Sequence, residues 1–226
     1  KVWTSYADKA DWIFCLVRTD TSVKHEGISF ILFDMESPGV EARPIQLISG
    51  ESPFCETFFS DVKVPKENLV GEEGQGFMYL MRELPRERLV IGALGVAAAR
   101  GALDLTINYA QERELFGQKL AQLQNTRFEI ARMETDCRVN RAFVDECIAL
   151  YEKGELDAPT ASMAKYSATE MQCRVADGCL QLFGGYGYTI EYTLSRAFIY
   201  ARVQRIYGGT SEVMKAIIVR SVLRKT

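Results

Sequence analysis

The chain has 226 residues, with 27 Lys and Arg against 30 Asp and Glu and a net charge of −3. This length is sufficient to bury a substantial core in one large domain or two small ones. The charges are well mixed, so no basic tract predicts a nucleic-acid partner, and no apolar run predicts a membrane span. The sequence opens at Lys1 with no Met and no signal-peptide pattern, and we expect it to be a C-terminal fragment.

The cysteines and the histidine content limit the chemistry further. The six cysteines form no CxxC pair and no metal-ligand spacing, and several fall on apolar helical stripes. We expect them to be reduced core residues of an intracellular protein. His25 is the single histidine, which excludes His-based triads and most zinc sites. A general base in this chain is therefore expected to be a carboxylate.

Residues 1–70 have the pattern of strands and turns. Short β-rich apolar runs predict strands at 12–17, 28–33 and 54–59, separated by Gly and Pro. The composition changes at 71–76, where helical periodicity begins. Residues 1–70 are therefore expected to be part of an antiparallel β domain.

Residues 71–226 have the periodicity of long helices. We predict helices at about 76–113, at about 120–152, from Pro159 to Gly184, and from an N-cap at Thr210 to Leu223, with a short segment near 192–200. Pro85 is expected to kink or break the first helix. The predicted fold is α+β, with the partial β domain followed by an antiparallel four-helix bundle.

A set of ordered motifs identifies a family resemblance that covers essentially the whole chain. Residues 205–212 closely resemble the Tyr-Glu-Gly-Thr-Ser signature of the acyl-CoA dehydrogenases. Residues 64–71 resemble the family's Val-Pro-x-Glu-Asn-x-Leu-Gly motif, and 112–117 its Arg-x-x-Phe-Gly loop. Each motif is weak alone, but the ordered set is specific. The resemblance implies FAD-dependent α,β-dehydrogenation of an acyl-CoA thioester and the C-terminal fold of that family.

One position departs from the signature, because Gly208 stands where most of the family has the catalytic Glu. The Gly208 N–H remains available to stabilise the developing enolate. The long-chain and isovaleryl enzymes instead place the base on the first helix of the bundle, in a Glu-Arg-Leu context. The resemblance therefore assigns Glu87 as the base and Arg88 as a supporting charge. Glu83, one turn earlier, departs from the motif and is the second candidate.

The resemblance also assigns FAD contacts to ten positions. Trp3 and Ser5 match the strand beside the flavin ring, and Arg113 and Phe116 match a loop that reaches the FAD of a neighbouring subunit. The remaining matches are Gln124, Gln181, Gly184, Gly185, Thr210 and Glu212. Without the resemblance, these residues have ordinary explanations as helix caps, surface charges and packed aromatics.

The family implies a homotetramer, an electron-transfer flavoprotein or similar acceptor, and a bacterial cytoplasmic or mitochondrial matrix location. The position of the base favours a long- or branched-chain acyl-CoA. Two other interpretations stay open at this point. One is an acyl-CoA oxidase or a flavin monooxygenase relative, and the other is a non-catalytic assembly module in which Gly208 marks lost activity.

Overall fold

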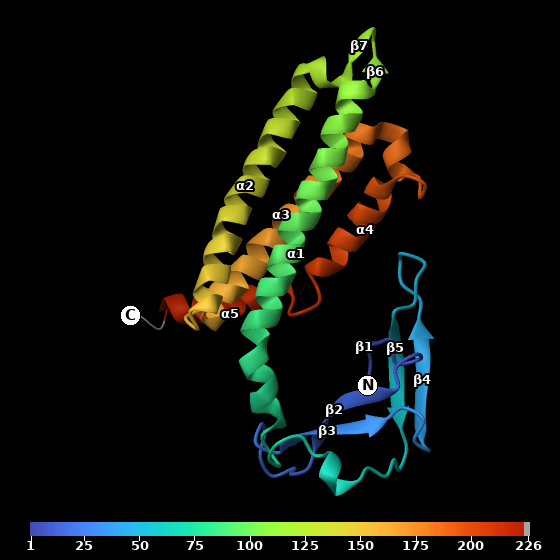
Figure 1. The fold of residues 1–226 in the computed structure, drawn as a ribbon, viewed down its shortest axis with the longest axis vertical. Coiled ribbons are helices and arrows are strands. Elements are labelled where there is room, and N and C mark those ends of the chain that lie inside the picture. The colour runs from blue at the N-terminus through green and yellow to red at the C-terminus, as the bar shows by residue number, and fades with distance from the viewer. Residues whose placement is uncertain (224–226) are drawn as a thin grey trace. The chain divides into compact units, whose positions relative to one another are not determined.

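A computed structural model describes residues 1–223 and divides the chain into two compact units, Lys1–Glu83 and Leu84–Thr226. The first unit holds the predicted strands and the second holds most of the helices (Figure 1). The α+β class predicted from the sequence is therefore confirmed.

The first unit is built from short antiparallel strands. Strands β2 and β3 pair in one hairpin, and the other three form a sheet in the order β1-β5-β4. The three predicted strands are confirmed as β2, β3 and β5, whereas β4 was not predicted from the sequence. The bounds are β1 Thr4–Ser5, β2 Trp12–Arg18, β3 Ile28–Asp34, β4 Val40–Ile45 and β5 Phe54–Phe59, followed by a 3-10 turn, η1, at Lys66–Asn68.

Along the β2–β3 hairpin, successive side chains alternate between a buried and an exposed face, as expected for a half-buried hairpin. Ile13, Cys15 and Phe33 form its small core, while Phe14 and Leu32 on the other face are exposed. The core is small for an independent domain.

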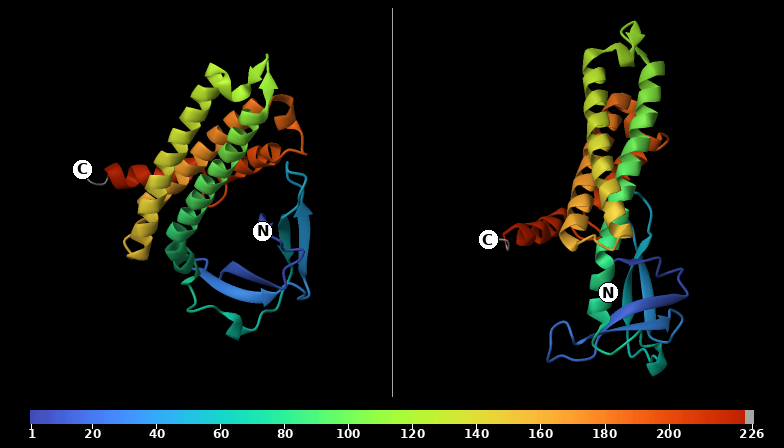
Figure 2. Two further views of the ribbon diagram at one scale, coloured as in Figure 1. Left: turned by 45° about the horizontal axis from the view of Figure 1, so that its top comes forward. Right: turned by 60° about the vertical axis from the view of Figure 1, so that its left-hand side comes forward.

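The second unit is a bundle of long helices. Its main elements are α1 Gly76–Glu112, which begins in the first unit, α2 Gln124–Glu152, α3 Ala158–Phe183, α4 Thr193–Gln204 and α5 Ser211–Leu223. Shorter elements are β6 Glu114–Leu115, β7 Gln118–Lys119, η2 Leu120–Gln122 and η3 Gly184–Tyr188. In both views of Figure 2, α1, α2 and α3 run side by side.

The helix boundaries agree with the sequence except at two places. Helix α1 continues through Pro85, so the break that was one of the two expected outcomes does not occur. Helix α2 starts at Gln124 rather than near 120, because Leu120–Gln122 forms a 3-10 turn. Helix α3 begins after Asp157, whose side chain accepts from the N–H of Thr160, and ends at Gly184 with φ of 60°. The N-terminal end is an ordinary Asp N-cap, and the C-terminal end uses the positive φ that glycine permits.

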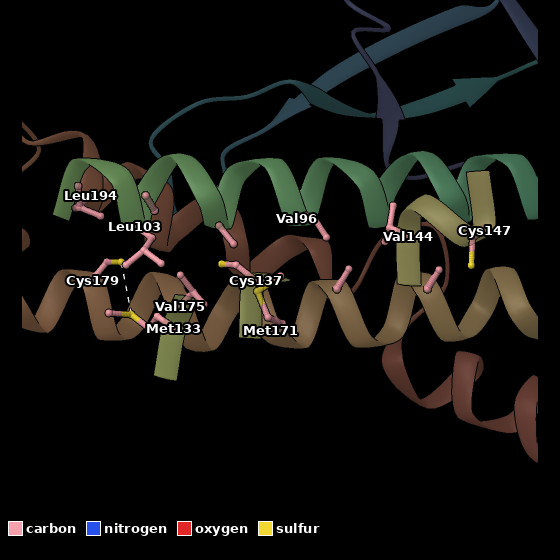
Figure 3. Packing of buried hydrophobic residues seen from close by; sticks show 14 of the residues in the cluster. Val96, Leu103, Met133, Cys137, Val144, Cys147, Met171, Val175, Cys179 and Leu194 are labelled. Atoms are coloured by element: carbon pink, nitrogen blue, oxygen red, sulfur yellow. Dashed lines mark hydrogen bonds between the residues drawn. The ribbon is translucent and has the colours of Figure 1, made fainter. Parts of the chain in front are cut away.

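The core of the second unit lies between α1, α2 and α3. Figure 3 shows Val96 and Leu103 of α1 pointing toward Met171 and Val175 of α3. The cysteines are free throughout the described residues, and all except Cys173 are fully buried. This agrees with the prediction that they are reduced core residues.

The expectation that no segment resembles a membrane span needs one qualification. Helix α1 is long and apolar enough to cross a membrane by length and composition alone. Several of its apolar side chains, including Leu89, Val96 and Leu103, are nevertheless buried in the bundle. Core packing therefore explains part of the hydropathy of α1, whereas other apolar side chains of this helix, such as Val90 and Leu94, are exposed.

Helices α1 and α3 approach closely because α1 has glycines at the contact. A Cβ atom added to Gly92 would lie 3.2 Å from the carbonyl oxygen of Ala164, and one added to Gly95 would lie 3.4 Å from that of Ala168. In contrast, a Cβ atom at Gly101, also in α1, would meet nothing within 4 Å.

This difference predicts opposite effects for the same substitution in one helix. Gly92→Leu should lower the free energy of unfolding by about 1–3 kcal/mol, because α1 and α3 must separate. Gly101→Leu should raise it by about 0.5–1 kcal/mol through helix propensity. Urea denaturation of the two variants tests the contact, and equal effects would contradict it.

Candidate active site

The loop between α4 and α5 holds the position that departs from the family signature (Figure 1). Gly208 and Gly209 have φ angles of 63° and 102°, which favour glycine over other residues. A Cβ atom added to Gly208 would lie 2.2 Å from Cδ1 of Ile91 in α1. The loop therefore rests on α1 at Ile91, and the Ile91 side chain occupies the space next to Gly208.

Glu87 precedes Ile91 by four residues on the same helix. Residues four apart lie on one helical face, with Cβ atoms about 5–6 Å from each other. Glu87 is exposed in this chain, so its carboxylate is accessible. The structure thus places Glu87 within one helical turn of the contact between Ile91 and Gly208.

Arg88, next to Glu87, points into the protein. It is only 6% exposed, and its Nη1 atom donates to Oγ of Ser162 at 3.4 Å. Its Nε atom is buried without a hydrogen-bond partner. Burial lowers the pKa of Arg88, and the charge of Glu87 opposes that shift. Arg88 is therefore a buried cation whose charge interacts with the Glu87 carboxylate.

Helix α3 holds the two ends of the Gly208 loop. Oε1 of Glu170 accepts from Nε of Arg205 at 2.8 Å and from Oγ of Ser211 at 2.7 Å. Burial alone would raise the pKa of Glu170, but the hydrogen bonds from Ser211 and Arg205 outweigh it and lower the pKa. Nζ of Lys165 donates to the carbonyl oxygen of Gly209 at 2.7 Å.

The sequence analysis did not identify Ile91, Lys165 or Glu170 as part of this site. For Lys165 a signal was present, because it lies on the buried stripe of α3 that includes Ala161, Ala164 and Ala168. A charged residue on such a stripe indicates a specific buried partner. For Ile91 no signal existed, since its role depends on which loop packs against it.

Most of the other candidate FAD residues gather at the far end of the bundle. Arg113 follows α1, and its guanidinium carbon lies 5.6 Å from the centre of the Tyr186 ring, next to Gly184 and Gly185. Phe116 is 91% exposed at the tip of the β6–β7 hairpin. Gln124 begins α2 and Gln181 lies in the last turn of α3, and both are exposed.

The remaining candidates lie elsewhere. Trp3 and Ser5 belong to the first unit, where they line a cleft of about 400 Å³ together with Trp12. Thr210 caps α5, because its Oγ1 atom accepts from the N–H of Val213 at 3.3 Å. Hydrogen bonds from its own N–H and from Thr210 lower the pKa of Glu212. The N-cap predicted at Thr210 is confirmed.

The second unit therefore contains two groups of candidate residues rather than one. At about 1.5 Å per residue, the stretch of α1 from Ile91 to Glu112 is roughly 30 Å long. Gly208 lies at the Ile91 end, whereas the hairpin with Phe116 lies at the other end (Figures 1 and 2). The structure does not bring the two groups together within one chain.

The residues at the hairpin end fit a dinucleotide such as FAD. Arg113 is an exposed cation, Phe116 offers an exposed aromatic face, and both Gly184 and Gly185 have open space where a Cβ atom would stand. A guanidinium suits phosphate oxygens, and open glycines let a ligand approach the backbone. At the other end, no backbone carbonyl of residues 1–223 accepts the N–H of Gly208. That donor is available to a ligand.

Comparison with known proteins gives consistent matches. Residues 74–223 match the family model described as acyl-CoA dehydrogenase, C-terminal domain. The long-chain specific acyl-CoA dehydrogenase of Sus scrofa mitochondria is 45% identical over 87% of this chain and 46% of that protein. The chain thus spans about half the length of that relative.

Two further proteins match almost the whole chain. The crystal structure of an acyl-CoA dehydrogenase from Geobacillus kaustophilus is 38% identical, with a TM-score of 0.95 over 98% of this chain and 60% of that one. The caffeyl-CoA reductase-Etf complex subunit CarC of Acetobacterium woodii is 34% identical over 100% of this chain and 60% of that protein.

The backbone of Gly208 generates a stability prediction. Gly208→Ala should lower the free energy of unfolding by about 1–2 kcal/mol, because a side chain is strained at this φ. Gly185→Ala is the matched control, since a Cβ atom there meets nothing within 4 Å and its φ is not in the left-handed region. Chemical denaturation measures both. A Gly208→Ala variant as stable as the unmodified chain would show that the loop does not hold this conformation.

Proposed function

Because the chain belongs to the acyl-CoA dehydrogenase family, we propose that it is the C-terminal part of an FAD-dependent enzyme that dehydrogenates an acyl-CoA thioester. Residues 1–70 are the last part of the middle β domain, and 71–226 are the helical domain that binds FAD and forms the oligomer. One observation supports the proposal most directly. Gly208 packs on Ile91, one turn from the Glu87 carboxylate.

Glu87 is the base in this proposal. Its carboxylate takes the α-proton of the acyl group, and the electron pair of that C–H bond forms the new double bond as the β-hydrogen leaves as hydride. When bound, FAD supplies the acceptor for that hydride. Arg88, the buried cation next to Glu87, keeps a positive charge beside the base throughout the proton transfer.

Gly208 supplies the electrostatic part of the reaction. Its N–H donates to the thioester oxygen, on which negative charge develops as the α-proton leaves. The donor belongs to the backbone, so the absence of a side chain at 208 does not remove it. Glu87 and Gly208 thus share the two tasks that one Glu residue and its own N–H perform in most of the family.

The two groups of FAD candidates imply that the cofactor is shared between chains. Arg113, Phe116, Gln124, Gln181, Gly184 and Gly185 would hold the diphosphate and adenine side of one FAD. Thr210 and Glu212, at the other end of the second unit, would contact a different FAD, and Trp3 and Ser5 are the FAD candidates of the first unit. Because the hairpin is roughly 30 Å from Gly208 along α1, its cofactor belongs to a neighbouring chain. The proposed assembly is a homotetramer.

The substrate and the acceptor follow from the relatives. The placement of the base at Glu87 and the similarity to long-chain specific enzymes favour a long- or branched-chain acyl-CoA. The name of the CarC relative includes an Etf complex, which supports an electron-transfer flavoprotein as the acceptor. Relatives come from mitochondria and from bacteria, so the mitochondrial matrix and the bacterial cytoplasm are both compatible locations.

The proposal predicts the result of removing one carboxylate. Glu87→Gln in the FAD-loaded protein should reduce the rate of flavin bleaching by a long-chain acyl-CoA by about 10²- to 10⁴-fold, since no base remains to take the α-proton. FAD should stay bound. Anaerobic stopped-flow absorbance follows the flavin directly.

Glu83→Gln is the matched control for that experiment, because it makes the same change one turn earlier on α1. This variant should bleach at a rate close to that of the unmodified protein. Loss of bleaching in Glu83→Gln with normal bleaching in Glu87→Gln would transfer the role of base to Glu83. Normal bleaching in both would overturn the assignment of a base on α1.

A second prediction concerns the cofactor. Arg113→Ala should weaken FAD binding by about 10- to 100-fold, the usual effect of losing a hydrogen bond to a charged group. Arg141→Ala, which removes an exposed ion pair with Asp145 on α2, is the control and should leave the affinity unchanged. Fluorescence titration with FAD measures both. Equal affinities would remove Arg113 from the FAD site.

A further inference from the structure

Lys165 is a buried cation that the proposed mechanism does not use. It lies in the middle of α3 and is 0% exposed. Its ammonium makes one hydrogen bond within the described chain, to the carbonyl oxygen of Gly209 at 2.7 Å. Burying an ammonium is unfavourable unless the protein compensates for the lost water. Packing alone therefore does not explain a lysine at this buried position of α3.

Lys165 contacts the Gly208–Gly209 segment, whose backbone can adopt more conformations than that of other residues. Gly208 and Gly209 both have positive φ, and glycine has more conformations to lose than any other residue. Two bonds close the ends of the loop, from the N–H of Ser211 to the carbonyl of Arg205 and from Ser211 Oγ to Glu170. At the two glycines, the hydrogen bond from Lys165 Nζ to the Gly209 carbonyl oxygen holds the backbone in place.

The position of Lys165 on α3 places it opposite the base. Arg88 of α1 donates to Ser162, three residues before Lys165, and Gly92 of α1 packs on Ala164, its neighbour. Lys165 thus lies next to the part of α3 that contacts Arg88 and Gly92 of α1, and its ammonium bonds the residue after Gly208.

We propose that Lys165 is a positioning residue, whose bond to the Gly209 carbonyl fixes the Gly208 N–H relative to the Glu87 carboxylate. This inference rests on the proposed function, because it deepens the role given there to Gly208. Lys165 does not touch the reacting atoms. It acts by restricting two consecutive glycines to the backbone conformation in which the Gly208 N–H meets the thioester oxygen.

Burial and the surrounding charges shift the pKa of Lys165. Burial lowers its pKa to about 8. Glu170 on α3 and Glu212 on α5 oppose the shift, while Arg88 on α1 and Arg205 in the loop add to it. Below that pH the buried group carries a positive charge beside the loop.

This pKa fixes the sign of a stability effect. Between pH 8 and the ordinary lysine pKa of 10.5, the unfolded chain binds more protons at Lys165 than the folded chain does. The stability contributed by this group therefore rises with pH across that window. Lys165→Met should remove this part of the pH dependence.

The first test uses the chain without any flavin chemistry. In the ¹⁵N-labelled protein, Lys165→Met should shift the amide signals of Gly208 and Gly209, while the signals of Gly184 and Gly185 stay in place. Lys153→Met, the same change at an exposed position after α2, is the matched control and should shift none of the four. Unchanged Gly208 and Gly209 signals in a folded Lys165→Met variant would overturn the proposal.

The second test measures the consequence for the reaction. In the FAD-loaded protein, Lys165→Met should lower the limiting rate of flavin reduction by about 10- to 100-fold, as expected when an oxyanion donor is displaced. The substrate concentration for half-maximal rate should change little, because Lys165 does not contact the substrate. A normal limiting rate would overturn the proposal. Lys165→Gln, smaller and also uncharged, provides the same test if the Met variant does not fold.

The two experiments separate this inference from the function on which it rests. If Glu87→Gln still reduces flavin normally, the proposed base is wrong, whatever the Lys165 variants do. If Glu87→Gln is inactive and Lys165→Met is fully active, the base stands and the positioning role is wrong. A rate loss in Lys165→Met that follows its loss of thermal stability, with unshifted glycine signals, would reduce Lys165 to a general structural residue.

Discussion

The arrangement of the candidate site depends on the close packing of α1 against α3. Gly92 and Gly95 permit this packing, because a Cβ atom at these positions would lie only 3.2 Å from the carbonyl oxygen of Ala164 and 3.4 Å from that of Ala168. This contact aligns the turn of α1 that contains Glu87 with the turn of α3 that contains Lys165. The loop between α4 and α5 then contacts both helices, through Ile91 of α1 and Lys165 of α3.

The contact between Gly208 and Ile91 explains how a glycine fits at a position where most relatives have an acid. The Ile91 side chain lies where a side chain at 208 would begin, and the carboxylate sits one turn earlier on α1. A carboxylate on a packed helix has fewer conformations than one on a loop with two glycines. In the proposed mechanism the base is therefore on the packed helix and the backbone donor is on the loop.

Periodicity was sufficient to predict the long helices, because their buried stripes and caps are local features of the sequence. Short β-rich apolar runs predicted β2, β3 and β5, but not β4, which is interrupted by Pro44. The base and FAD residues were assigned from motifs and remain proposals. Ile91 and Lys165 were not identified, because each is defined by a contact across more than 40 residues.

The central claim is that the carboxylate of Glu87, on α1, removes the α-proton. A 3-alkynoyl thioester of CoA tests it directly, because removal of its α-proton followed by protonation at C4 gives an electrophilic 2,3-dienoyl thioester next to the base that removed the proton. The FAD-loaded protein would be inactivated, digested and mapped by mass spectrometry. The account predicts a covalent adduct on Glu87. An adduct on Glu83 or Glu212, or inactivation of Glu87→Gln at an undiminished rate, would contradict it.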